Sequence, residues 1–225
     1  EPLCGATSPI TLAGNLVVCC VDTLTGVMLS QLARPGTPVL FGSVASITDL
    51  RDMKYLAGAV EMGLINAGFS QLAQFFKLPF YATAGMTDAK VNDAQAGYES
   101  ALTSLMVALA GGNWIHDAAG FIEFCMTASY DKLVIDNEIL GMVMRAVEGI
   151  RVDDETLALD AIKAVGPGGH FLSSRHTRRS MRHELYHPQL SDRASRPVWE
   201  AAGAADARQR ATARARQILQ APLQS

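Results

Sequence analysis

The sequence is poor in aromatic residues and in cysteine, and both scarcities narrow the class of protein. Aromatic residues make up 7% of the 225 residues, whereas hydrophobic residues as a whole make up 49%. A sizeable core is therefore possible, built mainly from aliphatic and small side chains. The four cysteines form no CxxC pair and have no metal-ligand spacing. This argues against a disulfide-rich secreted scaffold, and we expect buried free thiols in a cytoplasmic protein.

Lysine is missing from the last quarter of the chain, although this region is strongly basic. Residues 170–225 hold ten arginines against four acidic residues, whereas residues 1–169 hold nine basic against 18 acidic residues. Such a tail could bind an acidic partner, a phosphate or nucleic acid. We favour the alternative that the tail docks on the acidic body of its own protein, and we expect no nucleic-acid partner. Docking would bury Phe171, Leu172, Leu185 and Trp199.

A long uninterrupted apolar run is also missing. Residues 12–32 are long enough to cross a membrane, but they include Asn15, Asp22 and Gln31. A lipid-facing helix rarely carries an aspartate at its centre. We therefore expect a helix packed on both sides inside a soluble protein, and no membrane partner.

Strand-like segments alternate with helical segments in the first half of the chain. We predict strands near residues 3–6, 38–43, 79–84 and 113–117, with helices over 12–33, 57–76 and 92–110. This alternation favours a parallel sheet with helical crossovers, either a (β/α)8 barrel or a doubly wound sheet. Because four units make only half a barrel, we interpret the fold as α/β, the C-terminal half of a TIM-type barrel with C-terminal helices and a wrapping arm.

The predicted domain organisation has two parts. Residues 1–128 form a half-barrel of about four strand-helix units. Residues 129–225 form a helical extension with an Arg-rich C-terminal arm packed on the barrel. Within the extension, the apolar spacing predicts helices over 130–149, 152–165 and 207–219.

Small residues occupy the predicted carboxyl ends of the strands, where barrel enzymes place their active sites. They are Gly5, Gly42, Ser43, Gly85 and Gly120. One interpretation is that tight turns favour glycine and serine. The other is that a wide, flat ligand must approach the ends of the strands closely.

Polar candidates gather at the same ends, and each has a structural alternative. They are Tyr81, Asp88, Asp93, His116 and Asp117. Neighbouring strand residues point to opposite faces, so His116 and Asp117 can share one side only if the strand has ended. His116 could instead be a core histidine, and Asp88 and Asp93 could serve a turn and a helix N-terminus.

One metal-binding pattern is misleading. His183 and His187 match the HExxH pattern of zinc proteases, which needs both histidines on one helical face. Pro188 follows directly and disfavours a helical conformation at His187. We therefore expect no zinc and no other bound metal.

Several blocks of the chain resemble the trimethylamine methyltransferase family. The resemblance spans nearly the whole chain, which corresponds to the C-terminal half of such proteins. Its clearest parts are residues 85–99, residues 166–172, residues 176–179, residues 188–193, and Leu12-Ala13-Gly14 after residues 6–9.

The resemblance implies a (β/α)8 barrel of roughly twice this length that moves a methyl group from a methylated amine to the cobalt of a corrinoid on a separate protein. Family members that use trimethylamine carry a pyrrolysine, which is absent from these residues. Members without it are associated with quaternary amines such as glycine betaine. We therefore expect a corrinoid protein and a small methylated amine as partners, and a homo-oligomer.

On this interpretation the candidates take specific roles. Asp88, Asp93, His116 and Asp117 would lie near the methyl donor, with Tyr81 facing the cation and His116 as an alternative ligand for a betaine carboxylate. The small residues at the strand ends would admit the corrinoid. Two other classes stay open, namely another barrel enzyme such as a lyase or hydrolase, and a non-catalytic fragment or assembly subunit. With half of a barrel missing, an isolated chain could be inactive.

Overall fold

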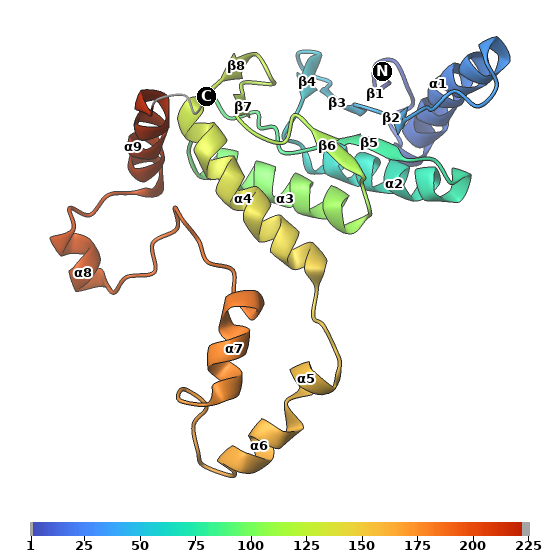
Figure 1. Cartoon of the computed structure of the whole chain (residues 1–225). Coiled ribbons are helices and arrows are strands. Elements are labelled where there is room, and N and C mark those ends of the chain that lie inside the picture. Colours follow the sequence, from blue (N-terminus) through green and yellow to red (C-terminus); the bar gives the residue numbers. More distant parts are fainter. Residues whose placement is uncertain (1, 222–225) are drawn as a thin grey trace.

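The parallel strands lie at the centre of the body of the molecule. The computed structural model describes residues 2–221 (Figure 1). Strands β2 (Phe41–Gly42), β5 (Phe80–Thr83) and β6 (Trp114–His116) form one parallel sheet in the order β2-β5-β6. β1 (Leu3–Cys4) pairs in parallel with β3 (Ser46–Asp49). The predicted parallel strands are therefore confirmed, with one difference. β1 pairs with β3, which follows the strand predicted over residues 38–43.

Long helices connect the strands and cover one side of the sheet (Figure 1). Helices α1 (Leu12–Ala33), α2 (Val60–Phe76) and α3 (Ala94–Leu109) connect strands, and α4 (Tyr130–Glu148) follows the last strand. Side-chain caps start two of them, because Asp93 accepts from the Gln95 and Ala96 amides and Ser129 accepts from the Lys132 amide. All four helices confirm the predicted ones, with ends shifted by up to three residues.

An aromatic cluster joins the helices to the sheet. The rings of Phe41 on β2 and Phe69 on α2 stack with centroids 4.5 Å apart, and Phe69 meets Phe80 on β5 edge-on at 5.5 Å. All three side chains are fully buried. Burying one such ring stabilises the fold by about 1.5–3 kcal/mol, so these few aromatics do much to fix the sheet against α2.

Two antiparallel hairpins follow the parallel strands and were not predicted. β3 pairs with β4 (Lys54–Leu56), and β7 (Phe121–Ile122) pairs with β8 (Thr127–Ala128). The β7–β8 turn places Glu123, Phe124 and Cys125 in succession at positive φ. Non-glycine residues rarely adopt this conformation, so local propensity favours no such hairpin.

The C-terminal region extends away from the body before it returns (Figure 1). The helix predicted over 152–165 is broken at Ala158, which has φ of 52° between α5 (Asp154–Leu157) and α6 (Leu159–Val165). Three helices follow, namely α7 (Arg175–Glu184), α8 (Arg196–Ala201) and α9 (Ala207–Gln220). α9 confirms the last predicted helix and packs along α4. α7 lies in a segment for which we predicted no helix.

The arm is less buried than we expected. Docking was expected to bury four side chains, but Phe171, Leu172 and Leu185 stay exposed and only Trp199 is partly buried. Arg179 pairs with Glu155 of the C-terminal region, 2.7 Å away, whereas Arg208 pairs with Asp131 on α4, 3.0 Å away. The expected burial was therefore wrong for three residues, and the division into two domains stays a prediction.

Helix α1 also differs from expectation. It is long and apolar enough to cross a membrane by length and composition, but only 11% of its most apolar window is buried. Val17, Val21 and Leu32 are exposed, so the expected packing on both sides was wrong within the described residues. Asp22 still argues against a lipid-facing helix, and the absence of a membrane partner stays a prediction.

The described sheets are small and open, with helices and strands alternating along the chain. The fold is therefore mixed α/β with parallel crossovers. The half-barrel is compatible with this arrangement, and we treat it below as a proposal.

Candidate functional site

Strand β5 and the carboxyl end of β6 bring together three of the predicted residues, namely Tyr81, His116 and Asp117. The rings of Tyr81 and His116 stack with centroids 4.7 Å apart. His116 Nδ1 lies 2.6 Å from Thr83 Oγ1 and 3.3 Å from the carbonyl oxygen of Ala82. These contacts follow from the register, which places Thr83 opposite His116. Thr83 was missed in the sequence because a threonine in a strand is common.

A left-handed backbone brings Asp117 to His116. Residues next to each other on a strand would point apart, but β6 ends at His116 and Asp117 has φ of 57°. Its carboxylate Oδ2 then lies 2.8 Å from His116 Nε2. Both side chains keep some solvent contact, with 23% and 30% exposed. The two residues therefore act as one polar group.

The contacts indicate which ring nitrogen carries a proton. A carboxylate can only accept, so Nε2 donates to Asp117, while Nδ1 contacts the Thr83 hydroxyl and the Ala82 carbonyl oxygen. Both nitrogens are then in use. His116 in this arrangement has no free donor for the carboxylate of a betaine.

Asp88 lies in the loop after β5 and holds another loop. Its Oδ1 accepts from the Ala57 amide at 2.7 Å, and the side chain is only 8% exposed. Burial raises the pKa of this carboxyl, although the backbone donors Gly58 and Ala57 oppose the shift. Asp88 therefore carries a local structural role.

Asp93 has a different local role. It is exposed and caps α3 through the Gln95 and Ala96 amides, at 2.9 and 3.3 Å. These bonds go to α3 and not to His116 or Asp117. The cap that the sequence allowed for Asp93 is thus present, and a substrate contact stays a prediction.

Cys125, in the β7–β8 turn, lies close to the site and was not predicted. Burial raises its pKa to about 11, and the nearby charges of Asp117 and Asp88 add to this shift. The thiol is therefore protonated at neutral pH and is a poor nucleophile. The Cys125 thiol is thus near both Asp88 and Asp117.

The small residues at the strand ends divide into two groups. Gly85 and Gly5 are needed for packing, since a Cβ on Gly85 would lie 2.5 Å from the Ala118 carbonyl oxygen and one on Gly5 would lie 2.7 Å from Leu50. Both have φ above 80°. Gly120 has φ of 88° and donates its amide to Asp136 at 2.8 Å.

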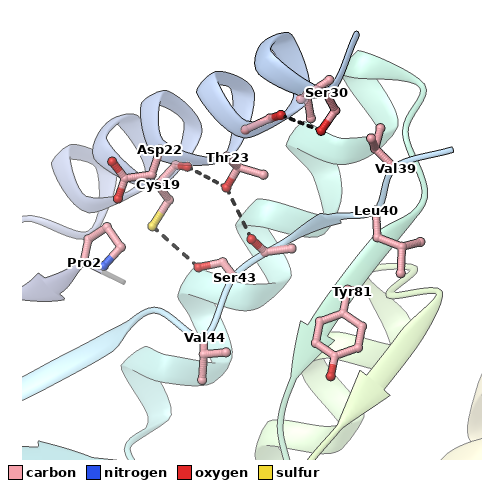
Figure 2. Close-up of a pocket in the computed structure, with 13 residues that line it drawn as sticks. Pro2, Cys19, Asp22, Thr23, Ser30, Val39, Leu40, Ser43, Val44 and Tyr81 are labelled. Carbon is pink, nitrogen blue, oxygen red and sulfur yellow. Dashed lines mark hydrogen bonds between the residues drawn. The ribbon is translucent and has the colours of Figure 1, made fainter. Parts of the chain in front are cut away.

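The other two small residues line a hollow. Gly42 and Ser43 border a pocket of about 670 Å³ between α1, β2 and β5, with Tyr81 at its far side (Figure 2). Thr23 donates to the Gly42 carbonyl oxygen, and the Ser43 hydroxyl contacts the Cys19 thiol. The pocket thus runs along α1 and β2, and it shares Tyr81 with the polar cluster at β5 and β6.

The HExxH residues do not share a helix. α7 ends at Glu184, with His183 in its last turn, so His187 lies beyond the helix. Within residues 2–221, groups of three or more side chains able to hold a metal ion are absent. The geometry that zinc proteases need is therefore not formed here.

Comparison with known proteins identifies relatives along nearly the whole chain. The sequence pattern described as "Trimethylamine methyltransferase (MTTB)" matches residues 2–225. The trimethylamine methyltransferase MttB of Desulfitobacterium hafniense (strain DSM 10664 / DCB-2) is 46% identical over 216 residues, which are 96% of this chain and 43% of the relative.

One further relative carries a different name, and another comes from a different genus. The glycine betaine methyltransferase of Desulfitobacterium hafniense (strain Y51) is 40% identical over 96% of this chain and 45% of its own length. The trimethylamine methyltransferase MttB of Methanosarcina thermophila is 43% identical over 90% of this chain and 41% of its own length. The chain thus spans less than half the length of these relatives. The extent and identity of these matches show that the chain belongs to the trimethylamine methyltransferase family.

Proposed function

We propose that the full-length protein transfers a methyl group from a small quaternary amine to a corrinoid carried by a partner protein, at the carboxyl ends of β5 and β6. In this proposal the chain supplies the C-terminal half of a (β/α)8 barrel. The parallel order β2-β5-β6 with helical crossovers supports the barrel half. The carboxyl ends of the strands are where such barrels carry their active sites.

The cluster of Tyr81, His116 and Asp117 is the observation that carries the proposal. A quaternary ammonium is a permanent cation, and a carboxylate beside an aromatic ring face is a suitable binding site for it. Asp117 provides the carboxylate, and His116 fixes its position through the 2.8 Å contact. Tyr81 stacks on His116 and also borders the open pocket. A methylammonium group bound beside Asp117 would lie between the Tyr81 ring and the pocket.

The chemistry requires little of these residues beyond binding and orientation. The C–N bond breaks with its electron pair staying on nitrogen, so a neutral amine leaves and no proton has to move. The corrinoid, when its protein is bound, supplies the Co(I) nucleophile that receives the methyl group. The residues of this chain hold the cation, exclude water from it and direct one methyl group outward. Gly42, which lacks a side chain, and Ser43 leave the pocket open enough for a flat ring to approach.

The proposal is tested by following methylcobalamin formation with the full-length protein, its corrinoid partner and a panel of betaines and trimethylamine. We expect transfer from a quaternary amine. Asp117→Ala should lower the rate strongly, because the bound cation then lacks the carboxylate that faces it. His116→Ala should lower it less, because Asp117 remains. Asp52→Asn, at the exposed β3–β4 turn, serves as the control. Transfer from trimethylamine alone, or unchanged rates in both site variants, would contradict the proposal.

A further inference from the structure

A buried lysine links the end of β5 to the helices behind it. Lys132 on α4 is fully buried, and its Nζ donates to Ser100 Oγ on α3 at 2.6 Å. The Ser100 hydroxyl in turn donates to the carbonyl oxygen of Gly85 at 2.6 Å. Gly85 follows β5 and opens the loop that carries Asp88. The lysine charge is thus connected to this loop through one hydroxyl.

The same lysine is linked to the loop after β6 through its ion-pair partner. Nζ lies 2.6 Å from Oδ2 of Asp136, which is also fully buried. Asp136 Oδ2 accepts from the amide of Gly120 at 2.8 Å. Gly120 ends the loop that begins with Asp117. A continuous series of hydrogen bonds therefore joins the two loops.

The ion pair itself is a costly way to stabilise a fold. Burial lowers the pKa of Lys132 and raises the pKa of Asp136, since each charge loses its hydration. Buried ion pairs are often no more stabilising than apolar residues of similar volume. Retaining one here is easier to understand as a requirement for geometry than for stability.

The two loops are also in direct contact, so fixing both fixes the site. A Cβ on Gly85 would lie 2.5 Å from the Ala118 carbonyl oxygen. On the Asp88 side, Glu99 of α3 accepts from the Asp88 amide at 2.8 Å. Asp117, one residue before Ala118, keeps its left-handed conformation between β6 and this contact.

We propose that Lys132 and Asp136, with Ser100, are positioning residues that hold the Gly85–Asp88 and Asp117–Gly120 loops in register, and so set the orientation of Asp117 toward the methyl donor. This inference rests on the function proposed above. None of the three side chains touches the reacting atoms. They act through the backbone of the two loops.

Ser100→Ala in the full-length protein provides the first test, because it removes one oxygen and leaves the ion pair. Hydrogen exchange measured by mass spectrometry should become at least about threefold faster in residues 84–88, with a smaller change in residues 117–122. Unchanged exchange in residues 84–88 would overturn the proposal.

The second test replaces the pair as a whole. Lys132→Met with Asp136→Leu leaves the Gly120 amide without its acceptor, so exchange in residues 117–122 should rise. kcat should fall by about 10²-fold, with a smaller change in the amine KM, because orientation is lost more than affinity. Lys132→Gln with Asp136→Asn keeps an acceptor for Gly120 and should restore most of the loop protection and most of kcat. If the apolar variant does not fold, the amide pair and Ser100→Ala decide the outcome.

A matched control comes from an exposed pair with the same spacing. Arg196→Met with Glu200→Leu removes an i,i+4 pair on α8 and should leave loop exchange and kcat unchanged.

Wild-type kcat and wild-type exchange in the folded apolar variant would overturn the positioning role. Failure of the proposed function would instead appear as normal rates after Asp117→Ala, or as no methyl transfer by the wild type, and exchange would still report on the loops.

Discussion

Asp117 shows how a single backbone conformation decides what a residue can do. A strand would point its side chain away from His116, but φ of 57° turns the carboxylate back to within 2.8 Å. A non-glycine residue in this region costs about 1 kcal/mol or more, and such costs are concentrated at functional sites. Asp88 and Asp93 also carry carboxyl groups, but their hydrogen bonds serve the backbone of a loop and of a helix.

The two loop carboxylates should therefore respond differently to substitution. Asp88→Ala leaves the buried Ala57 amide without its acceptor, so we expect the free energy of unfolding to fall by about 1–3 kcal/mol. Asp93→Ala should cost about 0.5–2 kcal/mol, and Asp93→Ser close to nothing, because serine also caps helices. Denaturant titration of each variant measures these differences. A large loss of stability in Asp93→Ser would show that Asp93 does more than cap α3.

A buried carboxylate on α4 binds the chain where the C-terminal region returns to the body. Glu138 on α4 accepts from the amides of Gln189 and Ser191, both at 3.0 Å, and is only 6% exposed. α5, α6 and α7 lie farther from the body (Figure 1). The return of the chain toward α9 is thus anchored at α4 by backbone donors.

We predict that acid weakens this anchor. Burial alone would raise the pKa of Glu138, but the hydrogen bonds from Ser191 and Gln189 outweigh it and hold the pKa below its ordinary value of 4.5. A carboxyl with a lowered pKa stabilises the fold above that ordinary value, and the contribution is lost as the pH falls through the folded pKa. A protease active in acid should then cut the arm near residues 185–195 faster as the pH falls below 4.5.

The same anchor can be removed at neutral pH. Glu138→Gln should accelerate tryptic cleavage after Arg193, which is exposed, whereas Glu148→Gln on the exposed end of α4 should not. Equal cleavage rates in the two variants would show that the arm is held elsewhere.

At the scale of the whole molecule, the described residues leave large apolar surfaces open. The α1 side chains Val17, Val21 and Leu32 are 60–74% exposed, and the sheets do not close. The curated relatives are more than twice as long as the matched region. We therefore expect the region that the relatives have in addition to complete the site.

This expectation predicts that the 225 residues expressed alone do not form methylcobalamin from any methylated amine. Co-expression with the remaining region of a relative should restore transfer and should lower the binding of an apolar dye, because α1 is then covered. Full activity of the isolated chain would show that the described site is complete by itself.

The sequence by itself determined the features that depend on local chemistry. Turn residues and apolar spacing placed the parallel strands and the helices from α1 to α4, and the Asp93 cap, because these signals act over a few neighbouring residues. α7 was missed because Met181 is the one apolar side chain among its ten residues, and β7–β8 because its turn needs three consecutive left-handed residues.

Only the tertiary structure decided how distant residues meet. The pairing of β1 with β3 rather than β2, the Tyr81–His116 stack and the Lys132–Ser100 bond all join residues 30 or more positions apart. Lys132 in particular is fully buried, whereas a lysine in a helix is ordinarily placed in solvent. Its burial follows from the close packing of α3 and α4, which no local pattern encodes. The physical reason is that side-chain contacts depend on where whole elements pack, whereas helices and turns depend on their own neighbours.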